Sequence, residues 1–319
     1  MNKHYIVTGA AGFIGYHFTK KLLEENFNVL GIDNLNDYYD IELKKMRLDR
    51  LKIHKNFSFY HVDICNLLDL NKIFKNNPKS IVVHLAAQAG VRLSETAPLS
   101  YFNSNANGFF NILEVTKKNN HKKLIFASSS SVYGDSKNPF RESDKKLVPK
   151  SLYGLTKLSN EFFARSFSLL NGIPSIGLRF FSVYGPWGRP DMAYYKFSEK
   201  IMADQPITLF NKGKNRRDMT YIDDIVDGVY FASCKEIEVN DSLILNLGNT
   251  VPIETNQLVQ EIENHYNKKA VIIDEDSTSE ILSTCSDNTL SYEQISYEPK
   301  TSFKEGMMNF FNWFDNFVK

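Results

Sequence analysis

The sequence contains few of the features that mark a secreted, metal-binding or membrane protein. Only three of its 319 residues are cysteines, Cys65, Cys234 and Cys285, and they stand too far apart for a C-x-x-C pair or a zinc-ligand spacing. We therefore expect no metal site, and we expect each thiol to fill space in the core of a cytoplasmic protein. No apolar run approaches the roughly 20 residues that span a bilayer, and no signal segment precedes the first strand-like stretch. We expect no membrane partner.

Excess charge of either sign is also missing. The 38 Lys and Arg residues are balanced by 37 Asp and Glu residues, which gives a net charge of +1 and no basic field to hold nucleic acid. The most basic segment, residues 43–55, intersperses Leu, Met and Ile among its cations. This pattern predicts an amphipathic helix with a solvated charged face rather than a membrane or RNA patch.

The first half of the chain alternates short apolar runs with helical patterns. Buried strands are predicted at 5–9, 27–33, 57–64, 80–87 and 123–130, with a sixth at 174–185. Helices are predicted at 13–26, 67–77 and 104–120, and another begins near Tyr153 and includes 158–171. Strand–helix alternation builds βαβ units. We therefore predict an α/β fold with a Rossmann-type doubly wound parallel sheet covered on both faces.

The composition of the sequence changes after about residue 186. Polar and aromatic segments interrupted by Gly and Pro indicate loops that close over a ligand. Helices are expected at 222–235, 255–267 and 302–317, with a short strand at 243–248. We predict a nucleotide-binding domain over 1–180, to which later segments return, and a smaller substrate-binding α/β domain mainly over 181–319.

A glycine-rich loop joins the first strand to the first helix. Gly9, Gly12 and Gly15 stand where such a loop lets backbone N–H groups approach a pyrophosphate at the positive end of a helix. The second strand ends at Asp33, whose carboxylate can bind ribose hydroxyls and would repel a 2′-phosphate, so NAD is favoured over NADP. The alternative for Asp33 is a simple turn residue. Asp63 and Ile64, after the third strand, are candidate contacts to the adenine.

Tyr153 and Lys157 stand four residues apart, so both side chains lie on one face of the predicted helix. A tyrosine titrates near pH 10, and a nearby ammonium group lowers the pKa of its hydroxyl. The pair is a candidate acid/base couple. Taken alone, it is equally two amphipathic side chains on a helix.

Four motifs occur together in the order seen in extended short-chain dehydrogenases/reductases. They are the glycine loop, His84-Leu-Ala-Ala87, the segment SSSSVYG at 128–134, and Tyr153-x-x-x-Lys157. The second half resembles nucleotide-sugar enzymes through RFFSVYGPWGRPDM (179–192) and RRDMTYIDDIVDGV (216–229). Together with DNLNDYYD (33–40) and AAQAGVR (86–92), these segments look most like UDP-glucuronate 4-epimerases.

The resemblance implies a function and a set of site residues. It implies NAD-dependent 4-epimerisation of a UDP-sugar, through a 4-keto intermediate that rotates in the pocket before hydride returns to its opposite face. Tyr153 would be the acid/base, Lys157 its activator and Ser129 a partner of the substrate hydroxyl. The implied cofactor contacts include Gly9, Gly12, Phe13, Ile14, Gly15, Asp33, Asn34, Asp63, Ile64, Leu85, Ala86 and Ala87. The implied substrate contacts are Arg92, Ser130, Ser131, Ser182, Arg189 and Arg217.

Several alternatives stay open on the sequence alone. Ser131 occupies the place where sister dehydratases and decarboxylases carry an acidic residue, which argues against those reactions. A 4-epimerase of a neutral UDP-hexose or UDP-N-acetylhexosamine, another nucleotide-sugar oxidoreductase or decarboxylase, and a silent binding protein remain. The arginines could form surface ion pairs, and the serines could cap a turn.

One segment departs from the family pattern, and one partner is implied. Residues 274–287 are acidic, with Glu280 near the place of the family's aspartate and no arginine, so no nucleotide contact is assigned there. Relatives dimerise through two helices per subunit. The stretches 104–120 and 158–171 are apolar enough to do so, and we expect a homodimer.

Overall fold

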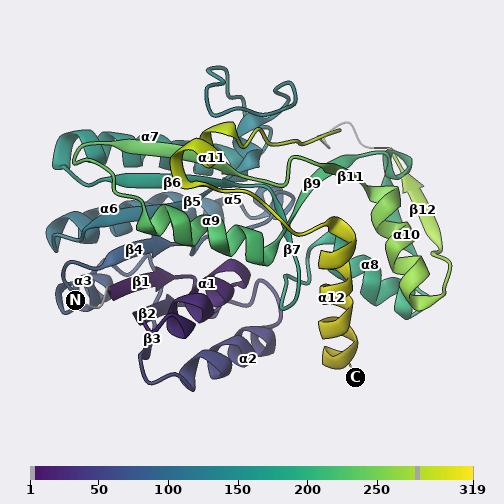
Figure 1. Cartoon of the computed structure of the whole chain (residues 1–319), viewed down its shortest axis with the longest axis horizontal. Helices are drawn as coiled ribbons and strands as arrows, with labels where there is room; N and C mark the ends of the chain where they lie inside the picture. Colours follow the sequence, from purple (N-terminus) through teal and green to yellow (C-terminus); the bar gives the residue numbers. More distant parts are fainter. Residues whose placement is uncertain (1–3, 277–280, 319) are drawn as a thin grey trace.

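The computed structural model describes residues 4–276 and 281–318 and forms two lobes (Figure 1). The larger lobe holds a seven-stranded sheet in the order β10-β6-β5-β4-β1-β2-β3, and every neighbouring pair is parallel. Its strands are β1 (His4–Thr8), β2 (Asn28–Asp33), β3 (Phe57–His61), β4 (Ile81–His84), β5 (Lys123–Ser129), β6 (Ser175–Phe180) and β10 (Ser242–Leu247). The predicted parallel sheet is confirmed.

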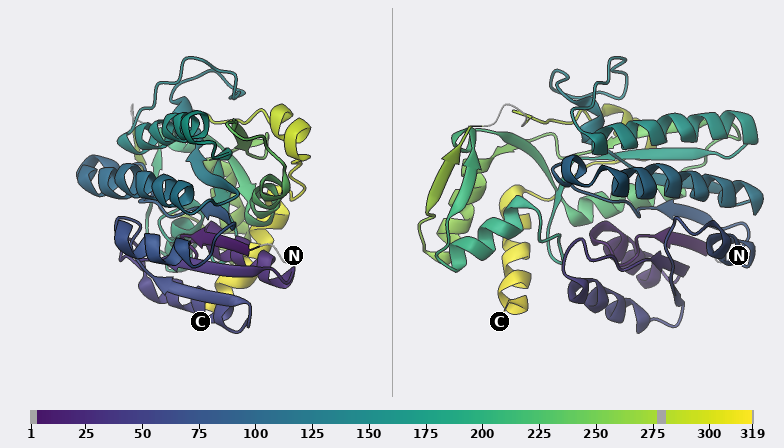
Figure 2. Two further views of the ribbon diagram at one scale, coloured as in Figure 1. Left: turned by 90° about the vertical axis from the view of Figure 1, so that its left-hand side faces the viewer. Right: turned by 180° about the vertical axis from the view of Figure 1, so that it is seen from behind.

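Helices cover both faces of this sheet (Figures 1 and 2). One layer contains α1 (Phe13–Glu24), α2 (Ile41–Lys52) and α9 (Ile222–Cys234), and the other contains α3 (Leu67–Lys75), α6 (Gly108–Lys118) and α7 (Leu152–Asn171). Successive strand residues point to opposite faces, so Tyr5 and Val7 join one hydrophobic core while Ile6 joins the other. Burial on both faces explains why the inner strands are almost continuously apolar. The prediction of a buried strand at 57–64 was wrong, because β3 lies at the edge of the sheet and has no buried residue.

The stretch predicted as one strand over 174–185 is two strands in two sheets. β6 ends at Phe180, and the amide of Phe181 donates to the carbonyl of Leu247. The chain then enters β7 (Ser182–Tyr184), which pairs with β9 (Arg216–Tyr221) in the smaller lobe. The prediction was wrong at this point because an unbroken apolar run does not reveal where a chain changes sheets.

The smaller lobe packs helices against two short sheets. β9 lies between β7 and β11 (Pro252–Glu254), and β8 (Ile207–Phe210) pairs with β12 (Ile272–Glu275). The helices are α8 (Ala193–Met202), α10 (Thr255–Tyr266) and α12 (Phe303–Phe317), and an aromatic cluster joins α8 to α12. α9 and β10 return to the large lobe, where α9 packs on α1 and β10 pairs with β6. α11 (Thr289–Ile295) packs against α9 and β10.

Short helical segments border the large sheet. The predicted helix over 104–120 is a π-helix at Phe102–Asn107 followed by α6, and α4 (Leu93–Thr96) and α5 (Pro98–Tyr101) precede it. A 3₁₀ turn at Ser130–Tyr133 follows β5, and another lies at Asn211–Gly213. Residues 277–280, which include Glu280, lie outside the described residues.

Two further expectations about burial were wrong. The helix predicted at 43–55 is present as α2, but Lys44 and Arg47 are buried rather than solvated, because α2 packs beside α1 and two loops. The cysteines are not core fillers, since Cys234 is exposed and Cys65 and Cys285 are partly exposed. Within the described residues, no helix is long and apolar enough to cross a membrane.

Candidate active site

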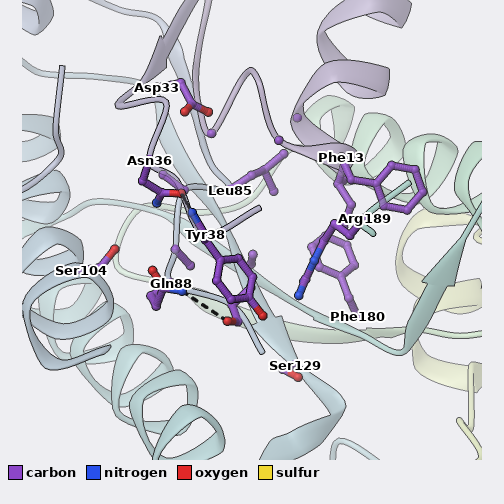
Figure 3. A pocket seen from close by; sticks show the side chains of 18 of the residues that line it. Phe13, Asp33, Asn36, Tyr38, Leu85, Gln88, Ser104, Ser129, Phe180 and Arg189 are labelled. Carbon is purple, nitrogen blue, oxygen red and sulfur yellow. Dashed lines mark hydrogen bonds between the residues drawn. The ribbon is translucent and has the colours of Figure 1, made fainter. Parts of the chain in front are cut away.

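A deep cavity lies between the two lobes, beyond the carboxyl ends of the parallel strands (Figure 3). Its lining extends from the glycine loop after β1 to Tyr153 and Lys157 on α7, so one cavity joins the candidate cofactor-binding residues to the candidate catalytic residues. The predicted site residues that line it are Gly9, Gly12, Phe13, Ile14, Gly15, Asp33, Asn34, Ile64, Leu85, Ala86, Ala87, Ser129, Tyr153, Lys157 and Arg189.

The glycine loop forms a cradle that no side chain could enter. Gly9 has a φ of +73°, and a Cβ on it would lie 2.7 Å from the backbone nitrogen of Ala86. A Cβ on Gly15 would lie 2.0 Å from the carbonyl oxygen of Gly9. α1 begins with Gly12 as its N-cap and no side-chain cap, so the first-turn amides are free to bind an anion.

Asp33 is held rigidly at the end of β2. Its carboxylate accepts hydrogen bonds from the amides of Ala11 (3.0 Å) and Leu35 (2.9 Å). Asn34 also lines the cavity and donates to the carboxylate of Asp63 (2.8 Å). Asp63 itself is not part of the lining. Asp63 therefore orients the side chain of Asn34 from outside the cavity.

Tyr153, Lys157 and Ser129 come together at the opposite end of the cavity. Ser151 caps α7 by accepting a hydrogen bond from the amide of Gly154 (3.1 Å), which starts the helix one residue before Tyr153. Lys157 donates to the carbonyl of Ala127 on β5 (2.9 Å), and its Nζ lies 5.9 Å from the centre of the Tyr153 ring. Ser129 ends β5 beside them.

Burial governs the ionisation of this group. It raises the pKa of Tyr153, while the charge of Arg189 and a hydrogen bond from Ser129 act in the opposite direction. It also lowers the pKa of Lys157 to about 8. The role of Lys157 as the activator of Tyr153 stays a prediction. Arg189, whose charge acts against the raised pKa of Tyr153, lies on the loop after β7.

Other predicted substrate residues lie outside the cavity lining. Ser130 and Ser131 continue into the 3₁₀ turn, where the amide of Ser131 donates to the hydroxyl of Ser129 (3.1 Å). The guanidinium of Arg92 lies over the Phe210 ring at 4.4 Å. Arg217 donates to the carbonyl of Ile281 (2.6 Å). Ser182 begins β7, and the roles of these residues stay predictions.

The structure adds lining residues that sequence reasoning did not select. They are Asn36, Tyr38, Tyr39, Lys44, Val62, Gln88, Ala89, Ser104, Ala127, Ser128, Phe180, Phe181, Val183 and Met192. Three of them, Asn36, Tyr38 and Tyr39, belong to the DNLNDYYD stretch, which was the available signal. Their side chains are placed by the loop that joins β2 to α2, and a loop path cannot be derived from residue patterns.

Arg47 links the glycine loop to the loop that carries Arg189. Its guanidinium is fully buried and donates to the carbonyl of Ala11 (2.9 Å) and to those of Trp187 (2.5 Å) and Gly188 (3.0 Å). Trp187 has a φ of +58°, an uncommon conformation for a bulky residue. The buried arginine thus stabilises a strained backbone directly before Arg189.

Comparisons with known proteins agree with this geometry. Residues 5–248 match the NAD dependent epimerase/dehydratase family. The chain is 41% identical over 312 residues to a UDP-glucuronate 4-epimerase of Thermodesulfobacterium geofontis, covering 97% of this chain and 95% of the relative.

Two solved structures show the same fold. A UDP-glucuronic acid 4-epimerase from Bacillus cereus, in complex with UDP-glucuronic acid and NAD, has a TM-score of 0.92 at 32% identity and covers 98% of this chain and 99% of that one. A UDP-glucose 4-epimerase from Thermotoga maritima with UDP-glucose has a TM-score of 0.89 at 29% identity, with 99% and 100% covered.

Proposed function

The chain belongs to the NAD dependent epimerase/dehydratase family, and we propose that it interconverts UDP-glucuronate and UDP-galacturonate by NAD-dependent 4-epimerisation. One observation carries the choice of a uronate. Arg189, a cation, lines the same cavity as Tyr153 and Ser129. A guanidinium at that place can pair with the C6 carboxylate of the sugar.

The residues present fit NAD. The glycine cradle and the uncapped start of α1 suit a pyrophosphate, and Asp33 suits the ribose hydroxyls. Bound NAD supplies a reversible hydride acceptor, so no net redox change occurs in a complete cycle. We assign the NAD site to residues 1–180 together with the returning α9 and β10, and most of 181–319 to the UDP-sugar.

The side chains around Tyr153 divide the remaining work. Tyr153 takes the proton from the C4 hydroxyl as C4 is oxidised, and returns it after the 4-keto sugar has rotated in the cavity. Ser129 hydrogen-bonds the reacting oxygen, and Lys157 adds positive charge to the site while its ammonium is held by Ala127. Arg217 and Arg92 contribute to binding the UDP-sugar from the smaller lobe and the β4 loop, and Ser130, Ser131 and Ser182 line the sugar subsite.

A substrate panel tests this proposal. We expect purified protein to convert UDP-glucuronate to UDP-galacturonate without CO₂ release and with no net NADH. UDP-glucose and UDP-N-acetylglucosamine, separated chromatographically after the same incubation, serve as the neutral comparison. Turnover of only a neutral sugar would show that the uronate assignment is wrong, and CO₂ release would identify a decarboxylase.

We also propose that the protein works in the cytoplasm as a homodimer. The exposed large apolar side chains of α5, the π-helix, α6 and α7 are Leu99, Phe102, Phe110, Leu155, Phe162, Phe163, Leu169 and Leu170. α6 and α7 lie side by side in the view from behind (Figure 2). Exposed apolar side chains gathered on neighbouring helices are typical of a protein–protein interface, and pairing two copies would cover them.

The dimer is tested by adding charge to this face. We expect Phe162→Glu, at a side chain that is 62% exposed, to convert a dimer into a monomer in sedimentation velocity at micromolar concentration. Burial of an unpaired carboxylate at an interface is strongly unfavourable. Met308→Glu on α12, also an exposed apolar position, is the control and should remain dimeric. A monomeric parent protein would rule out the interface.

A further inference from the structure

Arg189 is not a freely moving cation in the cavity. Its Nε donates to Oδ1 of Asp191 (2.9 Å) and its Nη2 donates to Oδ2 of the same carboxylate (2.5 Å). Two parallel hydrogen bonds between a guanidinium and a carboxylate fix the plane and the direction of both groups. The pair is largely shielded from solvent, with side-chain exposures of 22% and 23%.

Tyr38 completes this arrangement from a distant part of the chain. Its hydroxyl donates to Oδ2 of Asp191 (2.8 Å), across 153 positions of sequence. The Arg189 guanidinium also lies over the Tyr38 ring, 5.8 Å from its centre. We call Tyr38, Asp191 and Arg189 the arginine clasp. The clasp joins the β2–α2 loop of the large lobe to the loop after β7.

The surroundings hold the clasp in one ionisation state. Burial and the charge of Asp191 raise the pKa of Tyr38 above its ordinary value, so its hydroxyl stays a donor. The pKa of the Asp191 carboxyl is lowered despite the opposing effect of burial, chiefly by the charge of Arg189. At neutral pH, the clasp is therefore a neutral phenol, a carboxylate and a guanidinium.

The clasp also lies against the segment that borders Tyr153. A Cβ on Gly90 would come within 2.3 Å of the Tyr38 hydroxyl, so only glycine leaves room for it. Tyr101 donates to the carbonyls of Ala89 and Gly90, and its ring packs edge-on against Tyr153 at 6.2 Å. A displaced Tyr38 would therefore disturb a wall of the reaction site.

The clasp leaves a defined part of Arg189 for a ligand. A guanidinium has five N–H donors in a planar fork. Asp191 occupies the edge formed by Nε and Nη2, and among the described residues Nη1 has no hydrogen-bond partner. The guanidinium projects into the cavity (Figure 3). The remaining edge, Nη1 and the second hydrogen of Nη2, matches a planar carboxylate.

We propose that Asp191 and Tyr38 are positioning residues that determine specificity. They hold Arg189 so that the edge formed by Nη1 and Nη2 donates hydrogen bonds to the C6 carboxylate of the sugar. The inference rests on the proposed uronate substrate. A guanidinium placed in advance loses little conformational freedom when the sugar binds. Without the clasp, Arg189 would have to be ordered by the substrate itself.

Binding measurements on Asp191→Asn test the proposal in the NAD-loaded protein. We expect the dissociation constant for UDP-glucuronate, measured by calorimetry, to rise at least tenfold, while that for UDP, which has no sugar carboxylate, changes less than twofold. Tyr38→Phe should produce a smaller rise. Because Tyr38 acts through Asp191, its effect should disappear in the double variant, as a mutant cycle would reveal.

A matched pair of variants tests whether loss of any Tyr–Asp hydrogen bond weakens binding, wherever that bond lies. Tyr266 donates to Asp315 in the smaller lobe (2.9 Å), outside the cavity lining, so Tyr266→Phe and Asp315→Asn should leave both dissociation constants unchanged. Equal losses for UDP and UDP-glucuronate in Asp191→Asn, or no loss for either, would overturn the positioning role. Failure of the parent protein to bind or convert UDP-glucuronate would instead refute the proposed function.

Discussion

Tyr153→Phe is expected to slow epimerisation by at least about a hundredfold while leaving NAD bound. The variant keeps the ring, which packs against Tyr101 at 6.2 Å, and removes only the hydroxyl that exchanges a proton with the substrate. General acid–base catalysis by one side chain contributes roughly 10²–10⁴-fold to a rate, and we expect a loss in that range. Turnover is measured by separating UDP-glucuronate from UDP-galacturonate, and NAD content is measured in the purified protein.

A second tyrosine variant separates this effect from a general loss. Tyr292 is 60% exposed on α11, so Tyr292→Phe should retain full turnover. Near-normal activity in Tyr153→Phe would remove the central step of the mechanism. Loss of NAD together with activity would indicate a damaged cavity rather than a missing acid/base group.

The second large effect is expected at the glycine cradle. In Gly15→Ala, the new Cβ would lie 2.0 Å from the carbonyl oxygen of Gly9 and 2.7 Å from its carbon, both backbone atoms that cannot move aside easily. Overpacking of this kind costs about 1–3 kcal/mol, which corresponds to roughly a 5- to 150-fold weaker NAD affinity if the loop shifts to accommodate it. NAD titration of the stripped protein measures the change.

Gly228→Ala is the matched control, because it also adds a Cβ to a tightly packed helical glycine. Its closest neighbour would be a terminal methyl of Leu247 at 2.8 Å, a side-chain atom that can rotate away. Gly228 lies outside the cavity lining. We therefore expect a lower melting temperature at most and an unchanged NAD affinity. A Gly15→Ala protein with parental affinity would show that the cradle does not hold the pyrophosphate.

Much of the large lobe could be predicted because its signals are local. An apolar run bounded by turn residues predicts a strand, and a 3.6-residue period predicts a helix, so β1, α1 and β2 lie within a few residues of their expected positions. The switch from β6 to β7 was missed, because Phe180 and Ser182 differ in partner strands rather than in any local property.

Charge was harder to predict than structure. The cations of residues 43–55 were expected in solvent, yet Arg47 is fully buried because backbone carbonyls of two loops accept its hydrogen bonds. Those acceptors lie 36 to 141 positions away. A helical period shows which face a residue occupies and says nothing about a polar neighbour on that face.

The sequence by itself determined the sheet, the glycine cradle, Asp33 and the Tyr153–Lys157 pair, since each depends on backbone geometry within a few residues or on one helical turn. Only the tertiary structure decided what surrounds that pair. It brought Arg189 into the cavity that Tyr153 lines, paired Arg189 with Asp191, and placed Tyr38 against both from the other lobe. These contacts join loops far apart in the chain, and only folding brings such loops together.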